Sequence, residues 1–311
     1  GFQALKTNID GDFNTAVGYQ ALETFEADSD GHGKNTAVGY NAGQAVSTGT
    51  GNTILGADAG DALQGGDDNT FLGEGAGGAT TAGGSLVAIG KGSAAANLTS
   101  DADGSVFIGA AAGAAVTSGQ KNVAIGYQAL DAEDDGDSCV AIGHQALSAQ
   151  TGVSGEVGNT AVGALAGDAV TTGIKNVFVG AGAGGATTDV DETVVIGYGA
   201  GAANMTADAD GCIFIGAGAG AANVSGIGNT AVGYAALDTI DADDQNTAVG
   251  YKALTAQNAS DGETANTAVG YQAGQFLTTG THSTFVGNQA GQGIGATKLT
   301  GTHNTCVGSE A

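Results

Sequence analysis

Residues 14–22 read Asn-Thr-Ala-Val-Gly-Tyr-Gln-Ala-Leu, and residues 266–274 repeat this phrase with glycine in the last place. The glycine at its centre returns eighteen times, and eleven of the seventeen intervals between copies span seventeen positions. The other intervals are two to four positions longer. A short fixed period predicts that each repeat forms one coil, which buries its apolar side only by stacking on its neighbours. The glycines are Gly1, Gly18, Gly39, Gly56, Gly73, Gly90, Gly109, Gly126, Gly143, Gly163, Gly180, Gly197, Gly216, Gly233, Gly250, Gly270, Gly287 and Gly308.

The residues before each glycine alternate in a way that predicts a β-strand. With the glycine as position 0, position −1 is Val, Ile or Leu and position −3 is Thr, Val or Ile in all seventeen complete coils. Such alternation is typical of a short strand. We therefore expect an all-β fold, a parallel β-solenoid or β-roll of about eighteen coils, with position −3 on the inner wall.

Position −2 should be polar if the second face of the strand met water, yet it is Ala, Phe, Ile, Val or Cys in every coil. A strand that is apolar on both faces is buried on both faces. The sequence shows no helix that could cover the second face. We therefore expect copies of the same chain to pack around an axis through position −2.

Aromatic residues and asparagines occupy fixed positions of the coil. Five of the nine phenylalanines lie at position −2, all seven tyrosines lie at +1, and no coil has both. This exclusion predicts that −2 and +1 share one slot, which packs between chains; a stacking platform for glycans is the alternative interpretation of the tyrosines. Position −4 is Asn in eleven of seventeen coils, which predicts hydrogen-bonded asparagine ladders. The tyrosines are Tyr19, Tyr40, Tyr127, Tyr198, Tyr234, Tyr251 and Tyr271.

Charge and composition exclude several classes of partner. The net charge is −25, with seven lysines and no arginine, whereas binding to phosphate backbones needs Lys and Arg. We therefore expect no nucleic-acid partner, and no apolar run is long enough for membrane insertion. The spacing of Cys139, Cys212 and Cys306 along the stack excludes a disulfide within the chain. We therefore expect small buried side chains, and a disulfide between adjacent chains is the alternative.

The insertions that lengthen some coils are themselves periodic, with a unit of six coils. Residues 97–104 match residues 204–211, and Leu130-Asp131 matches Leu237-Asp238. This indicates block duplication, with the extra residues at one rim of the solenoid. Both ends of the chain lie inside the repeat, so we expect residues 1–311 to be a single repeat array and a segment of a longer polypeptide.

Acidic turns are the one candidate metal site. They are rich in Asp and Gly and resemble the opening of a calcium-binding loop, but they lack its downstream Glu. The acidic turns therefore have two interpretations. They are possible calcium sites, or they are plain solvated turns, which Asp and Gly also favour. The four histidines lack zinc-ligand spacing, and no nucleophile, base and orienting group stand together. We expect no other cofactor and no catalysis. The candidate ligands are Asp28, Asp30, Asp101, Asp103, Asp208 and Asp210.

The phrase Asn-Thr-Ala-Val-Gly-Tyr-Gln-Ala-Leu, with its fixed period, resembles repeats of tail-fibre-like proteins of bacteria and phages. Its Ala-Val/Ile-Gly centre is also similar to the head repeats of trimeric autotransporter adhesins, which are left-handed parallel β-rolls and homotrimers. The adhesin repeat is shorter, and this sequence contains neither the chaperone domain nor the membrane anchor of those proteins. The resemblance covers the whole chain.

The resemblance implies a structural or adhesive fibre segment. Such a segment is extracellular, on a virion tail fibre or a cell surface, and contacts a cell-surface glycan or protein receptor. It implies a homotrimer, intertwined or side by side. One alternative is a self-assembling extracellular filament, in which open solenoid ends stack on one another. The other is a polysaccharide-depolymerising tailspike, which would need a carboxylate pair in a groove.

Overall fold

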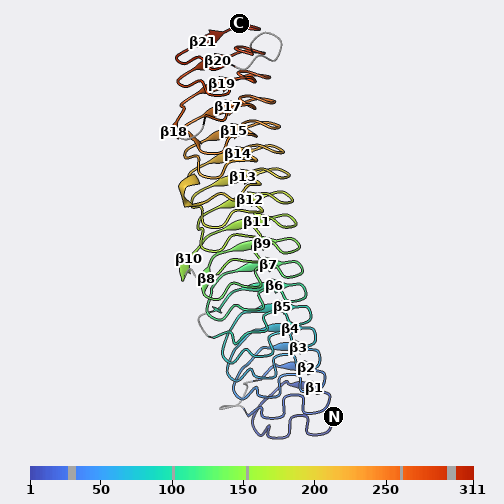
Figure 1. The fold of residues 1–311 in the computed structure, drawn as a ribbon. Helices are drawn as coiled ribbons and strands as arrows, with labels where there is room; N and C mark the ends of the chain where they lie inside the picture. Colours follow the sequence, from blue (N-terminus) through green and yellow to red (C-terminus); the bar gives the residue numbers. More distant parts are fainter. Residues whose placement is uncertain (27–32, 100–101, 152–153, 260–261, 293–298) are drawn as a thin grey trace. The chain divides into compact units, whose positions relative to one another are not determined.

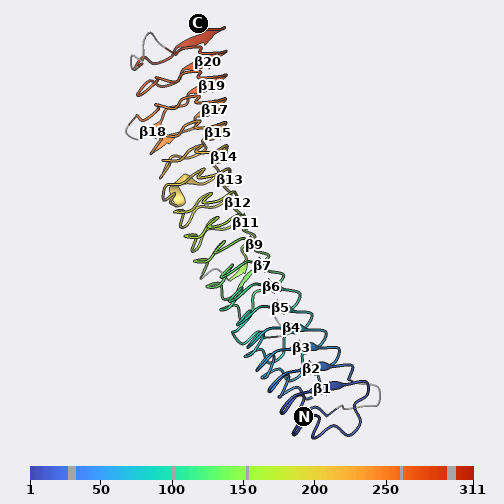
Figure 2. The same cartoon turned by 90° about the vertical axis from the view of Figure 1, so that its right-hand side faces the viewer.

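The computed structural model describes residues 1–26, 33–99, 102–151, 154–259, 262–292 and 299–311. The chain divides into two compact units, residues 1–158 (unit 1) and residues 159–311 (unit 2). Each unit is a parallel β-solenoid in which the chain makes one coil per repeat (Figures 1 and 2). This confirms the predicted fold class. Unit 2 contains one short 3-10 turn, η2, Ala207–Ala209, among its described residues. That both units form a single array stays a prediction.

Every coil contributes a three-residue strand that ends just before the repeated glycine. Within each unit, successive strands pair in parallel and in register, as Thr53 pairs with Thr70. In unit 1 these strands are β1 Thr15–Val17, β2 Thr36–Val38, β3 Thr53–Leu55, β4 Thr70–Leu72, β5 Val87–Ile89, β6 Val106–Ile108, β7 Val123–Ile125 and β9 Val140–Ile142. In unit 2 they are β11 Thr160–Val162, β12 Val177–Val179, β13 Val194–Ile196, β14 Ile213–Ile215, β15 Thr230–Val232, β17 Thr247–Val249, β19 Thr267–Val269, β20 Thr284–Val286 and β21 Thr305–Val307.

Four two-residue strands form another corner of the coils, where inserted residues lie. In unit 1, β8 Gly136–Asp137 pairs with β10 Gly155–Glu156. In unit 2, β16 Asp243–Asp244 pairs with β18 Gly262–Glu263. Both pairs are parallel, so this corner continues the stacking of the coils.

The two faces of the three-residue strands are reversed relative to the prediction. Position −2 points into the coil: Ala37, Ile54 and Phe107 are fully buried. Positions −1 and −3 point outward, and Thr53 and Leu55 on either side of Ile54 are exposed. Position −3 is therefore not the inner wall, and position −2 is not available for packing between chains. The prediction was wrong because both faces are apolar, so alternation alone did not reveal which one lines the interior.

Side-chain volumes inside the coil compensate between positions −2 and +4. An added Cβ at Gly113, position +4, would lie 2.1 Å from Cδ1 of Phe107, position −2. All five coils with Phe at −2 have Gly at +4, and all five complete coils with Leu at +4 have Ala at −2. The predicted slot shared by −2 and +1 is therefore wrong, because Phe107 is buried whereas the tyrosines at +1 are exposed.

The repeated glycine is fixed by the close approach of successive coils. At Gly126, φ is +144°, and a Cβ would lie 2.2 Å from the carbonyl oxygen of Gly143 in the next coil. Side chains other than hydrogen are excluded by both the backbone conformation and this contact. The residue that follows the repeated glycine begins the turn after the strand, as Tyr127 does after Gly126.

Asparagines at position −4 form the predicted ladder inside the coils. The backbone N–H of Asn52 donates to Oδ1 of Asn35 at 2.9 Å, and the N–H of Asn69 donates to Oδ1 of Asn52 at 2.9 Å. The side-chain Nδ2 of Asn52 donates to the carbonyl of Gly66 at 2.9 Å. Each buried amide thus joins neighbouring coils and closes a corner, which satisfies backbone groups that water cannot reach.

Candidate functional site

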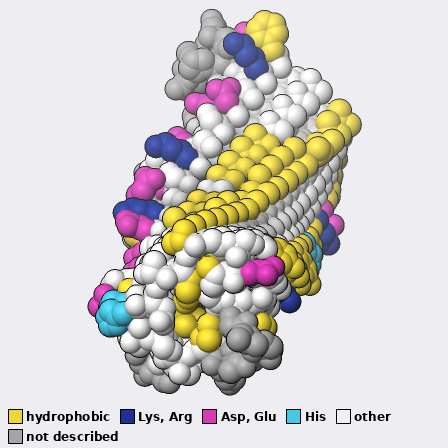
Figure 3. All heavy atoms as spheres, turned by 90° about the horizontal axis from the view of Figure 1, so that it is seen from above, with side chains coloured by type: hydrophobic (Ala, Val, Ile, Leu, Met, Phe, Trp, Pro, Cys, Tyr) yellow, Lys and Arg dark blue, Asp and Glu magenta, His cyan; other side chains and the backbone are white. Residues whose placement is uncertain are grey.

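The outer face of the strands is a surface of apolar and Thr side chains. In unit 1, Leu55 and Leu72 at position −1 of neighbouring coils are 44% and 39% exposed. In unit 2, Val269 and Val286 are each 38% exposed and pair in register. Figure 3 shows hydrophobic side chains gathered in rows on the surface. Exposed apolar patches of this kind mark interaction surfaces.

The tyrosines at position +1 stand on the outer surface, and several stack on one another. In unit 1, Tyr19 and Tyr40 have ring centroids 5.4 Å apart, and Tyr127 stacks on His144 at 5.5 Å. In unit 2, Tyr234 and Tyr251 lie 5.3 Å apart, and Tyr251 continues to Tyr271 at 5.2 Å. The exposed fraction of the seven tyrosines ranges from 40% to 76%. Both interpretations of the column, packing between chains and glycan contact, stay predictions.

Tyrosine rings stack because the coils are in register and the strand spacing is close to the spacing of stacked aromatic rings. Parallel strands lie about 4.8 Å apart, and offset-stacked rings have centroids roughly 4.5–7 Å apart. An aromatic at +1 in two successive coils therefore stacks without any special backbone feature. The +1 residue follows the glycine turn, so its ring faces solvent.

The acidic turns bind the backbone of the preceding coil. Oδ1 of Asp103 accepts the N–H of Gly84 at 2.6 Å, and Oδ1 of Asp210 accepts the N–H of Asp191 at 2.7 Å. Both aspartates lie at position −6. These carboxylates hold the rim of one coil to the next. The same contact recurs at this position for Asp67, Asp137, Asp191 and Asp244.

The structure brings no metal-binding cluster together in the part of the chain that it describes. Asp103, Asp208 and Asp210 are described, and none belongs to a group of three or more candidate ligands. Asp28, Asp30 and Asp101 lie outside the described residues. Calcium binding at the acidic turns therefore stays a prediction.

Glu133 is a carboxylate in the core of unit 1. Its side chain is fully buried, and Oε1 accepts the backbone N–H groups of Asp134, Asp135 and Gly136 at 2.9, 3.2 and 2.8 Å. Oε2 is buried and accepts no hydrogen bond from the described residues. Desolvation by burial raises the pKa of Glu133 above its ordinary value of 4.5, and the three N–H donors oppose this.

Glu133 should make the fold less stable as the pH rises. Because its pKa is higher in the folded chain, the folded state binds more protons, and the free energy of unfolding falls as the pH rises above the ordinary value of 4.5. We expect Glu133→Gln to be more stable than the native chain at neutral pH, with the difference vanishing below pH 4.5. Urea titrations from mildly acidic to mildly basic pH measure this. A native chain that gains stability relative to the variant as the pH rises would contradict it.

Two of the three cysteines are buried, as the sequence predicts. None forms a disulfide, and Cys139 and Cys212 are buried. Burial raises the pKa of the Cys212 thiol to about 11, which makes this thiol unreactive at neutral pH. Cys306 is partly exposed.

Comparison with protein-family models, with curated proteins and with solved structures finds no match to this chain. No helix within the described ranges has the length and apolarity needed to cross a membrane. The structure thus shows a parallel β-solenoid repeat protein, whose fold is consistent with a structural, fibre-like role.

Proposed function

We propose that this chain is a structural and adhesive fibre segment, whose copies associate through the outer face of the strands. The observation that supports this is the row of exposed apolar side chains at position −1, as at Leu55, Leu72, Val269 and Val286. A strand whose outward side chains are Val, Ile and Leu gains stability when another surface covers it. The partner surface proposed here is the same face of a second and a third copy.

The homotrimer follows the resemblance to adhesin heads and tail fibres, as does the extracellular location on a virion tail fibre or a cell surface. The high negative charge suits an exposed fibre, because repulsion between the acidic rims of separate particles keeps those particles soluble. Exposed tyrosine stacks along each unit supply contact area for a cell-surface glycan or protein receptor. No catalytic role, no nucleic-acid partner and no membrane insertion are proposed.

Light scattering of the chain in solution tests the association. We expect a mass three times the chain mass of 29.6 kDa, unchanged by EDTA. A variant with Val269→Glu and Val286→Lys places charges at paired positions of the outer face and should reduce the mass to that of one chain. The control is Ile227→Lys, which changes an exposed apolar residue away from the strands.

A native chain that scatters as a monomer contradicts the proposed association. Open-ended polymers instead of trimers would favour the end-to-end filament, and a mass that falls with EDTA would make calcium structural. A trimer that persists in the variant with both charged substitutions would show that the interface lies on a surface other than the strand face.

A further inference from the structure

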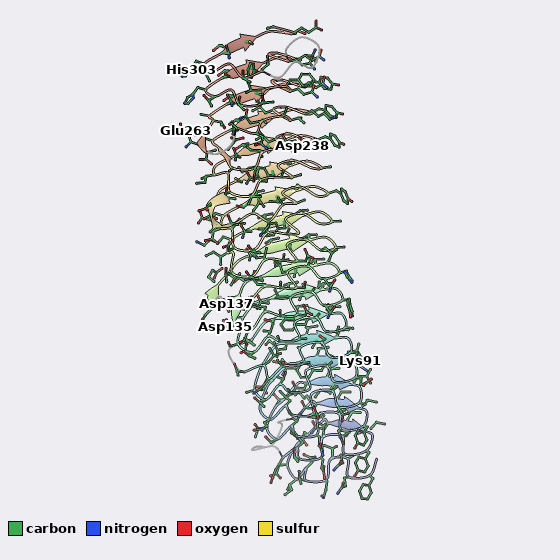
Figure 4. The ribbon with its side chains drawn as sticks, viewed as in Figure 1. Lys91, Asp135, Asp137, Asp238, Glu263 and His303 are labelled. Carbon is green, nitrogen blue, oxygen red and sulfur yellow. The ribbon has the colours of Figure 1, made fainter. Side chains whose placement is uncertain are left out.

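An open groove crosses the tyrosine column of unit 2. Position +1 in three successive coils is Tyr198, Ala217 and Tyr234. Their strands β13, β14 and β15 pair in register, so the two rings rise on either side of a coil that carries only a methyl group. The groove has a volume of about 310 Å³, and both rings, Ala217, Gly218 and Asp238 line it. Asp238 lies on the side of the turns that follow the strands (Figure 4).

The two rings are spaced to hold one group between them. Rings on adjacent coils of this unit lie 5.3 and 5.2 Å apart, so Tyr198 and Tyr234 are separated by two coil steps, roughly 10 Å. A group midway between them is about 5 Å from each ring, within the ~6 Å reach of a cation–π contact. Tyr198 is 76% exposed. Because Tyr251 covers one face of Tyr234, the other face of Tyr234 is turned toward the groove.

The carboxylate of Asp238 selects the charge of that group. Its Oδ1 is buried and accepts no hydrogen bond within the described part of the chain. Desolvation by burial raises the pKa of Asp238, whereas the positive charge of Lys252 and a hydrogen bond from the backbone N–H of Asp238 itself lower it. A buried carboxylate oxygen without a hydrogen-bond partner is stabilised more by a cationic ligand than by a neutral ligand. The net charge of −25 also attracts cations.

The same column already holds an ammonium group of the chain itself. Nζ of Lys252 lies 5.7 Å from the ring centroid of Tyr251, which is within cation–π distance. A cation of the chain thus lies within cation–π distance of one tyrosine of this column, although Tyr251 is also stacked between Tyr234 and Tyr271. Between Tyr198 and Tyr234 the room is greater, because Ala217 and Gly218 form the floor.

We propose that Tyr198, Tyr234 and Asp238 form a binding site for a methylated ammonium group, such as the trimethylammonium group of choline. The two rings contact the cation from opposite sides, and the carboxylate balances its charge. The methyl groups lie against Ala217 and Gly218, which present no polar side chain. This activity is separate from the association of strands proposed above, because the groove lies at the turns and not on the strand face.

The duplicated block supplies an internal comparison. In the earlier copy, which lies in unit 1, the corresponding positions are Lys91, Ala110, Tyr127 and Asp131. Oδ1 of Asp131 is also buried without a hydrogen bond from the described residues. Lys91 takes the place of Tyr198, however, and its Nζ pairs with Glu74 at 3.1 Å. Unit 1 therefore has one ring and the carboxylate, but not the second ring.

Calorimetric titration of the whole chain with choline tests the proposal. We expect one site per chain, and at least tenfold weaker binding of the neutral isostere in which carbon replaces the nitrogen. No binding of choline, or equal binding of the isostere, overturns the proposal. Binding of a neutral methyl glycoside in place of choline would assign the groove to glycans and also overturn it.

Substitutions locate the site. Tyr198→Lys copies the unit 1 arrangement and should abolish binding, and Asp238→Asn should weaken it at least tenfold. Tyr198 is largely exposed, so the circular dichroism spectrum should not change. Lys91→Tyr completes the second copy and should raise the stoichiometry to two. Binding that persists in Tyr198→Lys, or a stoichiometry that stays at one in Lys91→Tyr, contradicts the assignment to these residues.

Discussion

Gly126→Ala is expected to destabilise unit 1 by at least about 4 kcal/mol, the range of the most damaging single substitutions. The alanine Cβ would lie 2.2 Å from the carbonyl oxygen of Gly143, and the φ of +144° is strained for any residue with a Cβ. Neither atom can yield, because both belong to backbones fixed by pairing between β7 and β9. Urea denaturation followed by circular dichroism measures the loss.

Gly92→Ala in the same unit is the matched control. Gly92 also has a positive φ, +60°, but an added Cβ meets nothing within 4 Å. Gln128, at the corresponding position +2 of another coil, has a φ of +51°, so this conformation accepts a side chain. We expect a cost of roughly 1 kcal/mol for Gly92→Ala. Equal losses for the two alanine variants would show that the close approach at Gly126 is not what fixes the glycine.

Phe107→Ala and Gly113→Leu are each expected to be strongly destabilising, and together much less so. Phe107→Ala removes a fully buried ring, at a cost of about 3–5 kcal/mol. Gly113→Leu places a side chain whose Cβ would be 2.1 Å from the Phe107 ring. The double variant reproduces the Ala124 and Leu130 pair of the next coil, so the leucine fills the space that the ring leaves.

The double-mutant cycle gives the interaction energy between the two sites. Leu130 has a φ of +52° and Gly113 a φ of +58°, so the leucine is not excluded by the backbone. We expect a favourable coupling of at least about 2 kcal/mol between the two substitutions, the upper range for residues in contact. Losses that simply add would mean that positions −2 and +4 do not share volume, contrary to the packing described for the coils with Phe or Leu.

The strands and their stacking could be predicted from sequence because the period is fixed. Positions −3, −2 and −1 also keep the same residue types in every coil, as at Thr53, Ile54 and Leu55. Which face lies inside could not be predicted from alternation, because both are apolar. The decisive signal lay elsewhere: Phe107 occurs with Gly113, and Ala124 with Leu130, which places −2 and +4 opposite each other. The prediction coupled −2 with +1 instead, since it compared only aromatic residues.

The candidate sites depend on neighbours in successive coils, and this limits what the linear sequence reveals. The Tyr198, Ala217 and Tyr234 arrangement is visible only once the +1 residues are aligned across coils. The segments around the position −6 aspartates have a composition that indicates only turns. The contacts of these aspartates with backbone N–H groups of the preceding coil become visible only when the coils are stacked. The asparagine ladder was predictable because Asn at −4 recurs in eleven coils and stacks on itself.

In-register pairing has a consequence for how such a chain changes in length. Within unit 2, each strand from β11 to β15 presents the same donors and acceptors to the coil before it and to the coil after it. Any coil is therefore a valid neighbour for any other whose core volumes match. Whole coils can be gained or lost by unequal recombination without a new fold having to arise. The two matching six-coil blocks of the sequence are the pattern that such an event would leave, and they differ at exposed positions such as Lys91 and Tyr198.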